Sequence, residues 1–241
     1  MRVLVLGGTR AALTIAERID RETPARALLS LAGRTEHPDR GLGDVRIGGF
    51  GGAMGLTRYL HDAKIDGVID ATHPYAARMC HHAADACLRS GVPLIALHRE
   101  PWLAQRGDRF IPVPNLEAAA AAVCAYRRIF LTVGRQELLP FASSDRWFLI
   151  RSIDAPTEPL PHASHVILAR GPFTFESDLA LMRTYAIDCV VAKNSGGAAT
   201  YAKIQAARER AIPVVLVDRP TRPQGVPTFT QIDEIIAWVS A

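Results

Sequence analysis

Short, continuous apolar runs recur along the whole 241-residue chain, and segments with a helical pattern separate most of them. Runs of this kind are typical of parallel strands that connecting helices bury on both faces. We therefore expect an α/β fold with strands at residues 3–6, 27–32, 45–47, 67–70 and 92–97, and again at 129–133, 147–151, 165–169, 189–192 and 214–217.

The rhythm of strands and helices breaks near residues 100–108, where Pro101, Gly107 and mixed charges predict a linker. We expect a first domain at residues 1–100, a second α/β domain at residues 101–241, and a cleft between the two parallel sheets. The helices of these domains are expected at residues 11–21, 56–62, 74–90, 118–126, 177–185, 198–211 and 233–239.

The charge and the apolar pattern argue against several classes of protein. Lys and Arg number 28 against 24 for Asp and Glu, and no dense basic cluster predicts nucleic acid binding. No apolar run approaches the ~20 residues of a membrane span, and the first residues are expected to form a strand rather than a signal segment. The four cysteines form no C-x-x-C pair, so we expect free thiols in a reducing cytoplasm and no metal site.

A glycine-rich turn leads from the first strand into the first helix through Gly7, Gly8, Thr9 and Arg10. Glycines let the backbone approach a phosphate, and the helix N-terminus offers N–H groups and a positive dipole end. Thr9 and Ala12 stand where the dinucleotide-binding pattern G-x-G-x-x-G has its second and third glycines. The turn predicts a dinucleotide site, the alternative being a strand-to-helix turn without a ligand.

The second strand ends without the acidic residue that usually binds the ribose 2′-hydroxyl of NAD(H). Arg34 and Thr35 stand there instead, and the planar guanidinium of Arg34 suits a 2′-phosphate, so we expect NADP(H) as the cofactor. The glycine-rich stretch 48–52 follows the third strand and predicts backbone lying against the same ligand, at Gly49 and Phe50. The alternatives are an exposed surface arginine and a flexible turn.

Cationic side chains recur just after the expected strands, at the edge where ligands of parallel sheets bind. Several positive charges at this edge suit a small ligand with phosphates or carboxylates, and the alternative for each residue is a solvated surface charge. The residues are Arg10, Arg34, Arg99, Arg135, Arg170, Lys193 and Arg219.

The string DATHPYA, which begins at Asp70, ends one strand and opens a helix. Pro74 suits the first helical position, with Thr72 or His73 as the cap. One interpretation places Thr72, His73 and Tyr75 in the cleft beside a nicotinamide. In the alternative interpretation, Asp70 and Thr72 satisfy local backbone groups and Tyr75 packs on the sheet.

The string KNSGG occupies the corresponding place in the second half, and its residues are Lys193, Asn194, Ser195, Gly196 and Gly197. Ser195 and the two glycines predict a second anion-binding nest before the next helix. The alternative is the start of a capped helix without a ligand.

Together, the strings LGGTR at 6–10, DATHPYA at 70–76 and KNSGG at 193–197 resemble the precorrin-6A reductases of cobalamin biosynthesis across essentially the whole chain. The resemblance implies two Rossmann-like domains with a cofactor and a tetrapyrrole in the cleft. It also implies that NADPH reduces a ring double bond of precorrin-6A by direct hydride transfer, giving precorrin-6B. The alternatives are a cobalt-precorrin-6A reductase of the anaerobic route and a non-catalytic NADP(H)-sensing protein.

The strings and the resemblance together lead to a set of expected residue roles. We expect His73 and Tyr75 to orient the ring at the reaction centre. The cofactor is expected to contact Gly7, Gly8, Thr9, Arg10, Arg34, Thr35, Gly49, Phe50 and Thr72, and the carboxylates of the tetrapyrrole to contact Arg135, Arg170, Lys193, Asn194, Ser195, Gly196 and Gly197. We expect no nucleic acid or membrane partner, and transient contact with neighbouring enzymes of the pathway.

Overall fold

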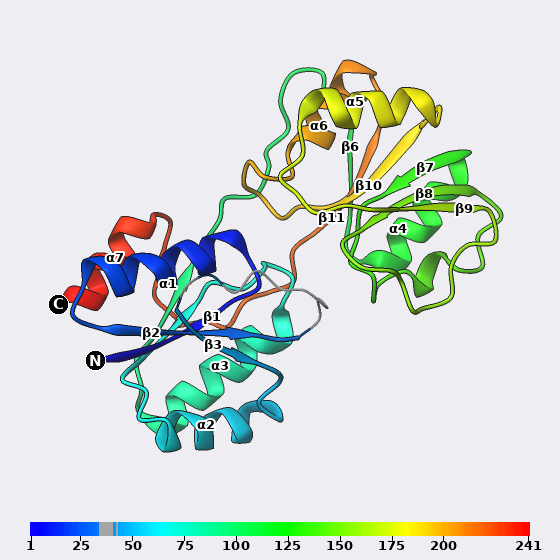
Figure 1. Cartoon of the computed structure of the whole chain (residues 1–241). Helices are drawn as coiled ribbons and strands as arrows, with labels where there is room; N and C mark the ends of the chain where they lie inside the picture. Colours follow the sequence, from blue (N-terminus) through cyan, green and yellow to red (C-terminus); the bar gives the residue numbers. More distant parts are fainter. Residues whose placement is uncertain (34–40, 42) are drawn as a thin grey trace. The chain divides into compact units, whose positions relative to one another are not determined.

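The computed structural model describes residues 1–33, 41 and 43–241 of the chain. Within this part, the chain divides into two compact units, one made of Met1–Arg99 with Pro220–Ala241 and the other of Glu100–Arg219. Each unit contains a six-stranded sheet, and the described strand pairs of both sheets are all parallel (Figure 1). The expected fold class, two α/β domains with parallel sheets, is confirmed.

The first unit orders its strands β12-β5-β4-β1-β2-β3. Its strands and helices, in chain order, are β1 (Arg2–Leu6), α1 (Arg10–Glu22), β2 (Arg26–Leu31), β3 (Asp44–Ile47), α2 (Gly52–Asp62), β4 (Gly67–Asp70), α3 (Ala77–Ser90), β5 (Leu94–Leu97), β12 (Thr228–Phe229) and α7 (Ile232–Ser240). Figure 1 shows α1 and α7 on one face of this sheet and α2 and α3 on the other.

Helices cover both faces of the first sheet, and this explains the apolar runs in its central strands. Ile15 and Ile19 project from α1 into the core on one face, and both are fully buried. Leu56 and Leu60 project from α2 into a second core on the other face. Because the strands are parallel, the loops that follow them gather at one edge of the sheet, where the expected cofactor residues within the described part of the chain lie.

The second unit repeats this plan with the strand order β6-β11-β10-β7-β8-β9. Its strands and helices are β6 (Phe110–Val113), α4 (Leu116–Ala122), the short 3-10 helix η1 (Val123–Ala125), β7 (Arg128–Leu131), the short 3-10 helix η2 (Leu139–Phe141), β8 (Trp147–Ser152), β9 (Ser164–Leu168), α5 (Phe175–Thr184), β10 (Cys189–Lys193), α6 (Ala202–Glu209) and β11 (Val214–Val217). Met182 of α5 and Ala206 of α6 pack against Phe130 and Val190 of the sheet.

The C-terminal segment 220–241 belongs to the first unit, which corrects the expected second domain of residues 101–241. β12 extends the first sheet beside β5, pairing Phe229 with Leu97. α7 then buries Ile235 and Val239 in the same core as α1. The sequence carries no signal for this return, because an apolar helix and a two-residue strand fit the edge of either sheet.

The structure also corrects the starts of two helices and adds one strand that was not expected. α3 begins at Ala77 rather than at Pro74, and its N-cap, Ala76, receives no side-chain hydrogen bond, so neither Thr72 nor His73 is the cap. α6 begins at Ala202 rather than at residue 198, because residues 198–201 form a turn. β6 was not expected as a strand, since it contains Pro112, which is tolerated at a sheet edge.

Candidate active site

The turn between β1 and α1 contains two glycines that are needed for different reasons. A Cβ on Gly7 would lie 2.7 Å from Leu29 Cδ1, so a side chain there would force Leu29 of β2 to move. Gly8 has a φ of +101°, which residues with a side chain rarely adopt, and a Cβ there would meet nothing within 4 Å. Gly7 therefore packs against the sheet, whereas the space beside Gly8 is empty.

Thr9 caps α1 and ties the glycine turn to a neighbouring loop. Its hydroxyl oxygen accepts a hydrogen bond from the Ala12 N–H at 3.1 Å and donates one to the Ala71 carbonyl oxygen at 2.8 Å. The first turn of α1 has no acidic residue, and its first residue, Arg10, is exposed. This helix N-terminus therefore favours an anion, whereas the hydroxyl proton of Thr9 is already used within the protein.

The glycine-rich loop after β3 is held by Arg46, a residue that the sequence analysis did not single out. The Arg46 guanidinium donates hydrogen bonds to the carbonyl oxygens of Gly48 at 2.5 Å and Gly49 at 2.6 Å. It also stacks on Phe50, with Cζ 3.8 Å from the ring centroid, and Phe50 meets Tyr59 edge-on. The Phe50 ring is thus packed within the first unit, while the backbone at Gly49 has open space beside it.

Asp70 is the buried centre of the loop that follows β4. Its Oδ1 accepts hydrogen bonds from the Thr72 N–H at 3.1 Å and from the Thr72 hydroxyl at 2.6 Å. The Thr72 hydroxyl also lies 3.6 Å from the Sγ atom of Cys80. Burial raises the pKa of the Cys80 thiol to about 11, with Asp70 as a second cause, so this thiol is protonated at neutral pH. Asp70 and Thr72 therefore satisfy local groups, as the alternative interpretation expects.

His73 and Tyr75 lie side by side on the same loop, with ring centroids 5.6 Å apart and planes tilted by 40°. The His73 Nδ1 atom accepts a hydrogen bond from the Tyr75 N–H at 3.3 Å, so a neutral His73 carries its proton on Nε2. Both residues are partly exposed. The hydrogen bond from Thr9 to Ala71 joins this loop to the glycine turn, so the structure brings these two expected sites together.

The expected 2′-phosphate residues, Arg34 and Thr35, lie outside the described part of the chain. The strand before them, β2, ends at Leu31 and lies between β1 and β3 in the sheet. The Gly48 N–H donates a hydrogen bond to the Leu31 carbonyl oxygen at 2.8 Å. The ends of β2 and β3 are therefore adjacent, on the side of β1 away from β4.

In the second unit, Lys193 forms an ion pair with Glu137. Lys193 ends β10, and Glu137 lies in the loop after β7, the neighbouring strand. Glu137 also accepts a hydrogen bond from the Gly134 N–H at 2.9 Å. The pair therefore links two strand ends, and a substrate carboxylate that approaches Lys193 would compete with Glu137 for its charge.

The Asn194 side chain is hydrogen-bonded to the backbone of Trp102, near the start of the second unit. Its Oδ1 accepts a hydrogen bond from the Trp102 N–H at 2.7 Å, and its Nδ2 donates one to the Trp102 carbonyl oxygen at 3.3 Å. The Trp102 indole N–H donates to the Gly197 carbonyl oxygen at 3.1 Å. A Cβ on Gly196 would lie 2.1 Å from the Glu100 carbonyl oxygen. The string KNSGG therefore has a structural role in addition to the anion-binding role expected of it.

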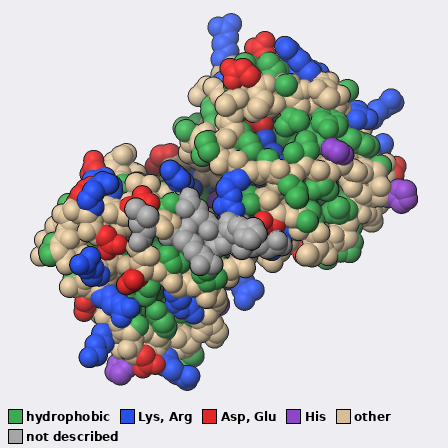
Figure 2. Space-filling view, viewed as in Figure 1, with side chains coloured by type: hydrophobic (Ala, Val, Ile, Leu, Met, Phe, Trp, Pro, Cys, Tyr) green, Lys and Arg blue, Asp and Glu red, His purple; other side chains and the backbone are tan. Residues whose placement is uncertain are grey.

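The remaining expected substrate residues lie on separate strand ends of the second unit. Arg135 donates a hydrogen bond to the Ala155 carbonyl oxygen at 3.4 Å, and Arg170 is exposed after β9. Ser195 is buried, and its N–H donates to the Lys193 carbonyl oxygen at 2.7 Å. Figure 2 shows Lys and Arg side chains interspersed with Asp and Glu, so the positive charges on that face form no continuous basic surface.

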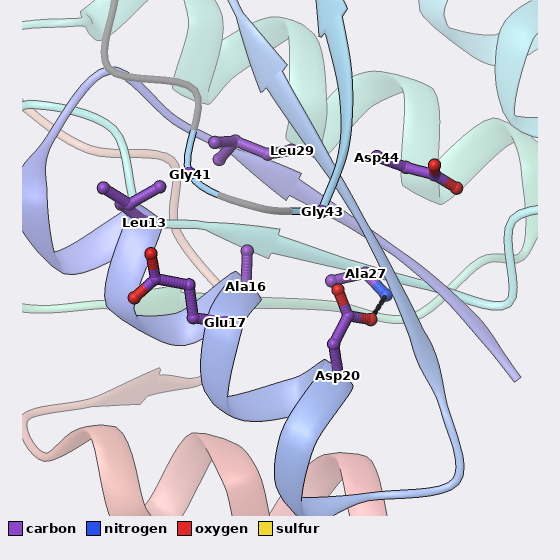
Figure 3. Close-up of a pocket in the computed structure, with 9 residues that line it drawn as sticks. All are labelled: Leu13, Ala16, Glu17, Asp20, Ala27, Leu29, Gly41, Gly43 and Asp44. Carbon is purple, nitrogen blue, oxygen red and sulfur yellow. Dashed lines mark hydrogen bonds between the residues drawn. The ribbon is translucent and has the colours of Figure 1, made fainter.

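The described residues that line the cavity drawn in Figure 3 include none of the expected site residues. Its carboxylates make it a poor phosphate site, and one of them, Asp20, already accepts a hydrogen bond from the Ala27 N–H at 2.9 Å. The lining residues are Leu13, Ala16, Glu17, Asp20, Ala27, Leu29, Gly41, Gly43 and Asp44. In the described residues, no cluster of three or more His, Cys, Asp or Glu could hold a metal ion, and no helix could span a membrane.

Comparison with known proteins decides the family. A family model described as precorrin-6x reductase CbiJ/CobK matches residues 2–240. The chain belongs to this family. It is 44% identical over 240 residues to the precorrin-6A reductase of Rhodococcus erythropolis, covering 99% of this chain and 97% of that relative. It is 47% identical over 242 residues to the precorrin-6A reductase of Rhodobacter capsulatus, covering 99% and 96%.

A solved structure described as CobK precorrin-6A reductase matches the fold with a TM-score of 0.93 at 43% identity, covering 99% of this chain and 96% of that one. The cobalt-precorrin-6A reductase of Salmonella typhimurium is 27% identical over 233 residues, covering 91% of this chain and 88% of that relative. The chain is therefore more similar to the relatives named precorrin-6A reductase. These matches confirm the expected family and the expected class of enzyme, a reductase.

Sequence reasoning missed a buried charge cluster in this precorrin-6x reductase. Arg151 of β8 and Asp178 of α5 form a buried ion pair. Lys203 of α6 is also buried and donates a hydrogen bond to the Thr200 carbonyl oxygen at 2.8 Å. Burial lowers the pKa of Lys203 to about 7, and the charge of Arg151 is a second cause. No sequence signal marks the three as neighbours, because they come from three separate elements.

Proposed function

We propose that this chain uses NADPH to reduce a ring double bond of precorrin-6A, giving precorrin-6B in cobalamin biosynthesis. The observation that carries the proposal is the open backbone at Gly8, beside the N-terminus of α1 and joined to the His73 loop through Thr9. Its neighbours provide helix N–H groups and an exposed Arg10, which favour a pyrophosphate. The family match supports the tetrapyrrole as substrate.

The proposal assigns the cofactor to the first unit. The Gly7–Arg10 turn would hold the pyrophosphate, and Gly49 would present its backbone to the nucleotide. Arg34, with Thr35, would bind the 2′-phosphate, because a planar guanidinium can donate two parallel hydrogen bonds to phosphate oxygens. Phe50 and Thr72 would shape the site through backbone and apolar contacts, since the Phe50 ring and the Thr72 hydroxyl already have partners in the protein.

The proposal assigns the carboxylates of the tetrapyrrole to the strand ends of the second unit. Arg135, Arg170 and Lys193 supply the charges, and the backbone of Ser195, Gly196 and Gly197 supplies donors. Asn194 contributes by holding Trp102 and thereby the shape of the same loop. The reaction is placed in the cytoplasm, where the free thiols would stay reduced, with transient contact with neighbouring pathway enzymes.

NADPH, when bound, supplies the hydride that a ring carbon of the substrate accepts. The protein contributes mainly by orientation, which can supply about 7–11 kcal/mol in well-aligned reactions. His73 and Tyr75 would orient the ring, and the hydrogen bond from the Tyr75 N–H to His73 Nδ1 fixes the position of the imidazole. A conjugated macrocycle accepts a hydride readily, and the proton that completes the reduction can come from solvent, so the proposal requires no protein side chain as a proton donor.

A transfer experiment tests the proposed reaction. The purified protein is mixed with precorrin-6A and NADPH that carries deuterium on the nicotinamide ring. We expect deuterium in the tetrapyrrole product, detected by mass spectrometry, and a slower reaction with the cobalt-containing substrate. Binding of NADPH without turnover would favour the NADP(H)-sensing alternative, and faster turnover of the cobalt-containing substrate would favour the anaerobic route.

Arg34→Ala is expected to weaken the binding of NADPH much more than the binding of NADH. The loss of a charge-assisted contact to the 2′-phosphate costs about 1.5–3 kcal/mol, which corresponds to a Michaelis constant raised roughly 10- to 150-fold. NADH lacks this phosphate, so its Michaelis constant is expected to stay nearly unchanged. Steady-state kinetics with both cofactors measure the difference, and an equal loss for both would remove Arg34 from the cofactor site.

Neutralising Arg135, Arg170 or Lys193 is expected to weaken tetrapyrrole binding and leave NADPH binding nearly unchanged. Substrate binding should also weaken as salt rises, because exposed charges are screened over ~8 Å at physiological ionic strength. Titration of each alanine variant with the tetrapyrrole and with NADPH measures both effects. Arg183→Ala, which removes an exposed charge from α5, is the matched control. If the three variants lost NADPH instead, the roles of the two units would be reversed.

A further inference from the structure

Arg222 reaches the buried Asp70 from the C-terminal segment, 152 positions further along the chain. Its Nη2 lies 3.3 Å from Asp70 Oδ2, and its Nη1 donates a hydrogen bond to the Leu97 carbonyl oxygen at 3.3 Å. Asp70 ends β4 and Leu97 ends β5, which are neighbours in the first sheet. One guanidinium therefore joins two adjacent strand ends to the segment that leads into β12.

The two oxygens of Asp70 have different partners. Oδ2 faces Arg222, whereas Oδ1 accepts both hydrogen bonds from Thr72. A carboxylate that is fixed at both oxygens has a single orientation, so Arg222 sets the plane in which Thr72 is held. The next contact outward is the Ala71 carbonyl oxygen, which receives the hydroxyl of Thr9, the cap of α1. These contacts connect the C-terminal segment to both loops of the proposed cofactor site.

The surroundings of Arg222 differ from those of a solvated surface charge. Its side chain is 26% exposed and that of Asp70 only 5%. Removing a guanidinium from water costs free energy unless its partners replace the lost hydration, which the carboxylate and the Leu97 carbonyl do here. Pro223 follows directly and restricts the backbone of Arg222 to extended conformations, which reduces the freedom lost in holding the side chain.

We propose that Arg222 is a positioning residue of the reductase, which orients Asp70 and thereby the loop of residues 71–76 against the bound cofactor. This inference rests on the proposed function, because it takes that loop to meet NADPH. The C-terminal segment, which returns to the first unit, would then have a functional role in addition to completing the core.

Arg222→Met tests the role, because it removes both donors and keeps an unbranched apolar stem. We expect the Kd for NADPH to rise about tenfold, as for the loss of a hydrogen bond to a charged group, while the KM for precorrin-6A stays unchanged. Arg222→Lys is expected to restore part of the affinity, since an ammonium reaches one partner. Arg89→Met, which breaks an exposed pair with Asp85 on α3, is the control and should leave the Kd unchanged.

The rate at which the Cys80 thiol is labelled measures how tightly this loop is held, and this measurement does not depend on catalysis. Cys80 is buried with its Sγ beside the Thr72 hydroxyl, so loosening of the loop would expose it. A Cys124→Ser background removes the exposed thiol, and labelling of each remaining cysteine is followed by mass spectrometry. We expect Arg222→Met to label Cys80 about tenfold faster through local opening, with Cys87 unchanged.

Faster labelling of Cys80 together with weaker NADPH binding supports the inference. Unchanged labelling of Cys80 would overturn it, as would faster labelling with an unchanged Kd for NADPH. Equal acceleration at Cys80 and Cys87 would also overturn it, because that pattern reports loss of global stability. Arg222→Lys carries the same comparison if Arg222→Met does not fold. Failure of the proposed function is seen separately, as a wild-type protein that binds no NADPH.

Discussion

Gly8→Val is expected to abolish measurable NADPH binding while the chain stays folded. Gly8 has a φ of +101°, and a side chain there would project into the open space beside the N-terminus of α1. A branched side chain strains the turn by about 1–3 kcal/mol and occupies the volume proposed for the pyrophosphate. A domain that is stable by about 5–15 kcal/mol tolerates this strain. Fluorescence titration with NADPH and circular dichroism measure the two effects.

Gly91→Val is the matched control for this result. Gly91 follows α3, has a φ of +70°, and also has nothing within 4 Å of a built Cβ. It should therefore lose a comparable amount of stability and keep its affinity for NADPH. If folded Gly8→Val bound NADPH as the wild type does, the turn would be a plain strand-to-helix connection. If Gly91→Val also lost NADPH, the loss would report strain rather than occupied space.

The parallel α/β class of each unit, with the positions of most of its strands, was the most predictable property of the chain. Buried parallel strands must be apolar on both faces, so runs such as Val3–Leu6 and 214–217 carry an unambiguous signal. The pairing of β12 with β5 was not predictable. Two residues carry no periodicity, and the decision between the two sheets depends on how Ile235 and Val239 of α7 pack on α1.

The motifs predicted which loops carry the candidate site, but they did not predict the partners of the side chains in those loops. The strings predict that Thr9, Thr72 and Asn194 lie at strand ends, and the structure places them there. Their side chains, however, are used inside the protein, by Ala71, Asp70 and Trp102 respectively. Local spacing cannot reveal the partners of Thr9 and Asn194, which lie 62 and 92 positions away in the sequence. The partner of Thr72 is only two residues away, so local reasoning could anticipate it, as the alternative interpretation of DATHPYA does. Distance in the sequence also hid Glu137 and Arg222, whose partners Lys193 and Asp70 lie 56 and 152 positions away. Arg46 was missed for another reason, because its partners are nearby backbone carbonyl groups, which no residue pattern marks.

Asp178→Asn is expected to lower the free energy of unfolding by about 3–5 kcal/mol, the usual cost of breaking a buried ion pair by removing one partner. Asp178 is fully buried beside Arg151, so the change leaves the Arg151 guanidinium buried without its carboxylate, and it removes the charge that favours the protonated form of Lys203. Urea unfolding followed by circular dichroism measures the loss. Asp233→Asn is the control, because its pair with Arg18 is exposed and is expected to contribute little to stability.

The contribution of Lys203 to stability depends on pH, whereas that of Arg151 does not, because a guanidinium stays charged. Burial lowers the pKa of Lys203 to about 7, whereas in the unfolded chain it is about 10.4. Between these values the unfolded chain binds a proton that the folded chain does not, so the contribution of Lys203 to stability rises with pH.

Lys203→Met removes this group. The gain in the free energy of unfolding over the wild type should be greatest near and below pH 7 and should decrease toward pH 10. Unfolding titrations of both proteins at pH 6, 8 and 10 measure the change. In the Asp178→Asn background the same substitution should recover part of the lost stability at pH 6, where Lys203 is most protonated and Asp178 no longer balances its charge. A pH-independent difference between wild type and Lys203→Met would show that the ammonium stays charged throughout, balanced by Asp178 and by its hydrogen bond to Thr200.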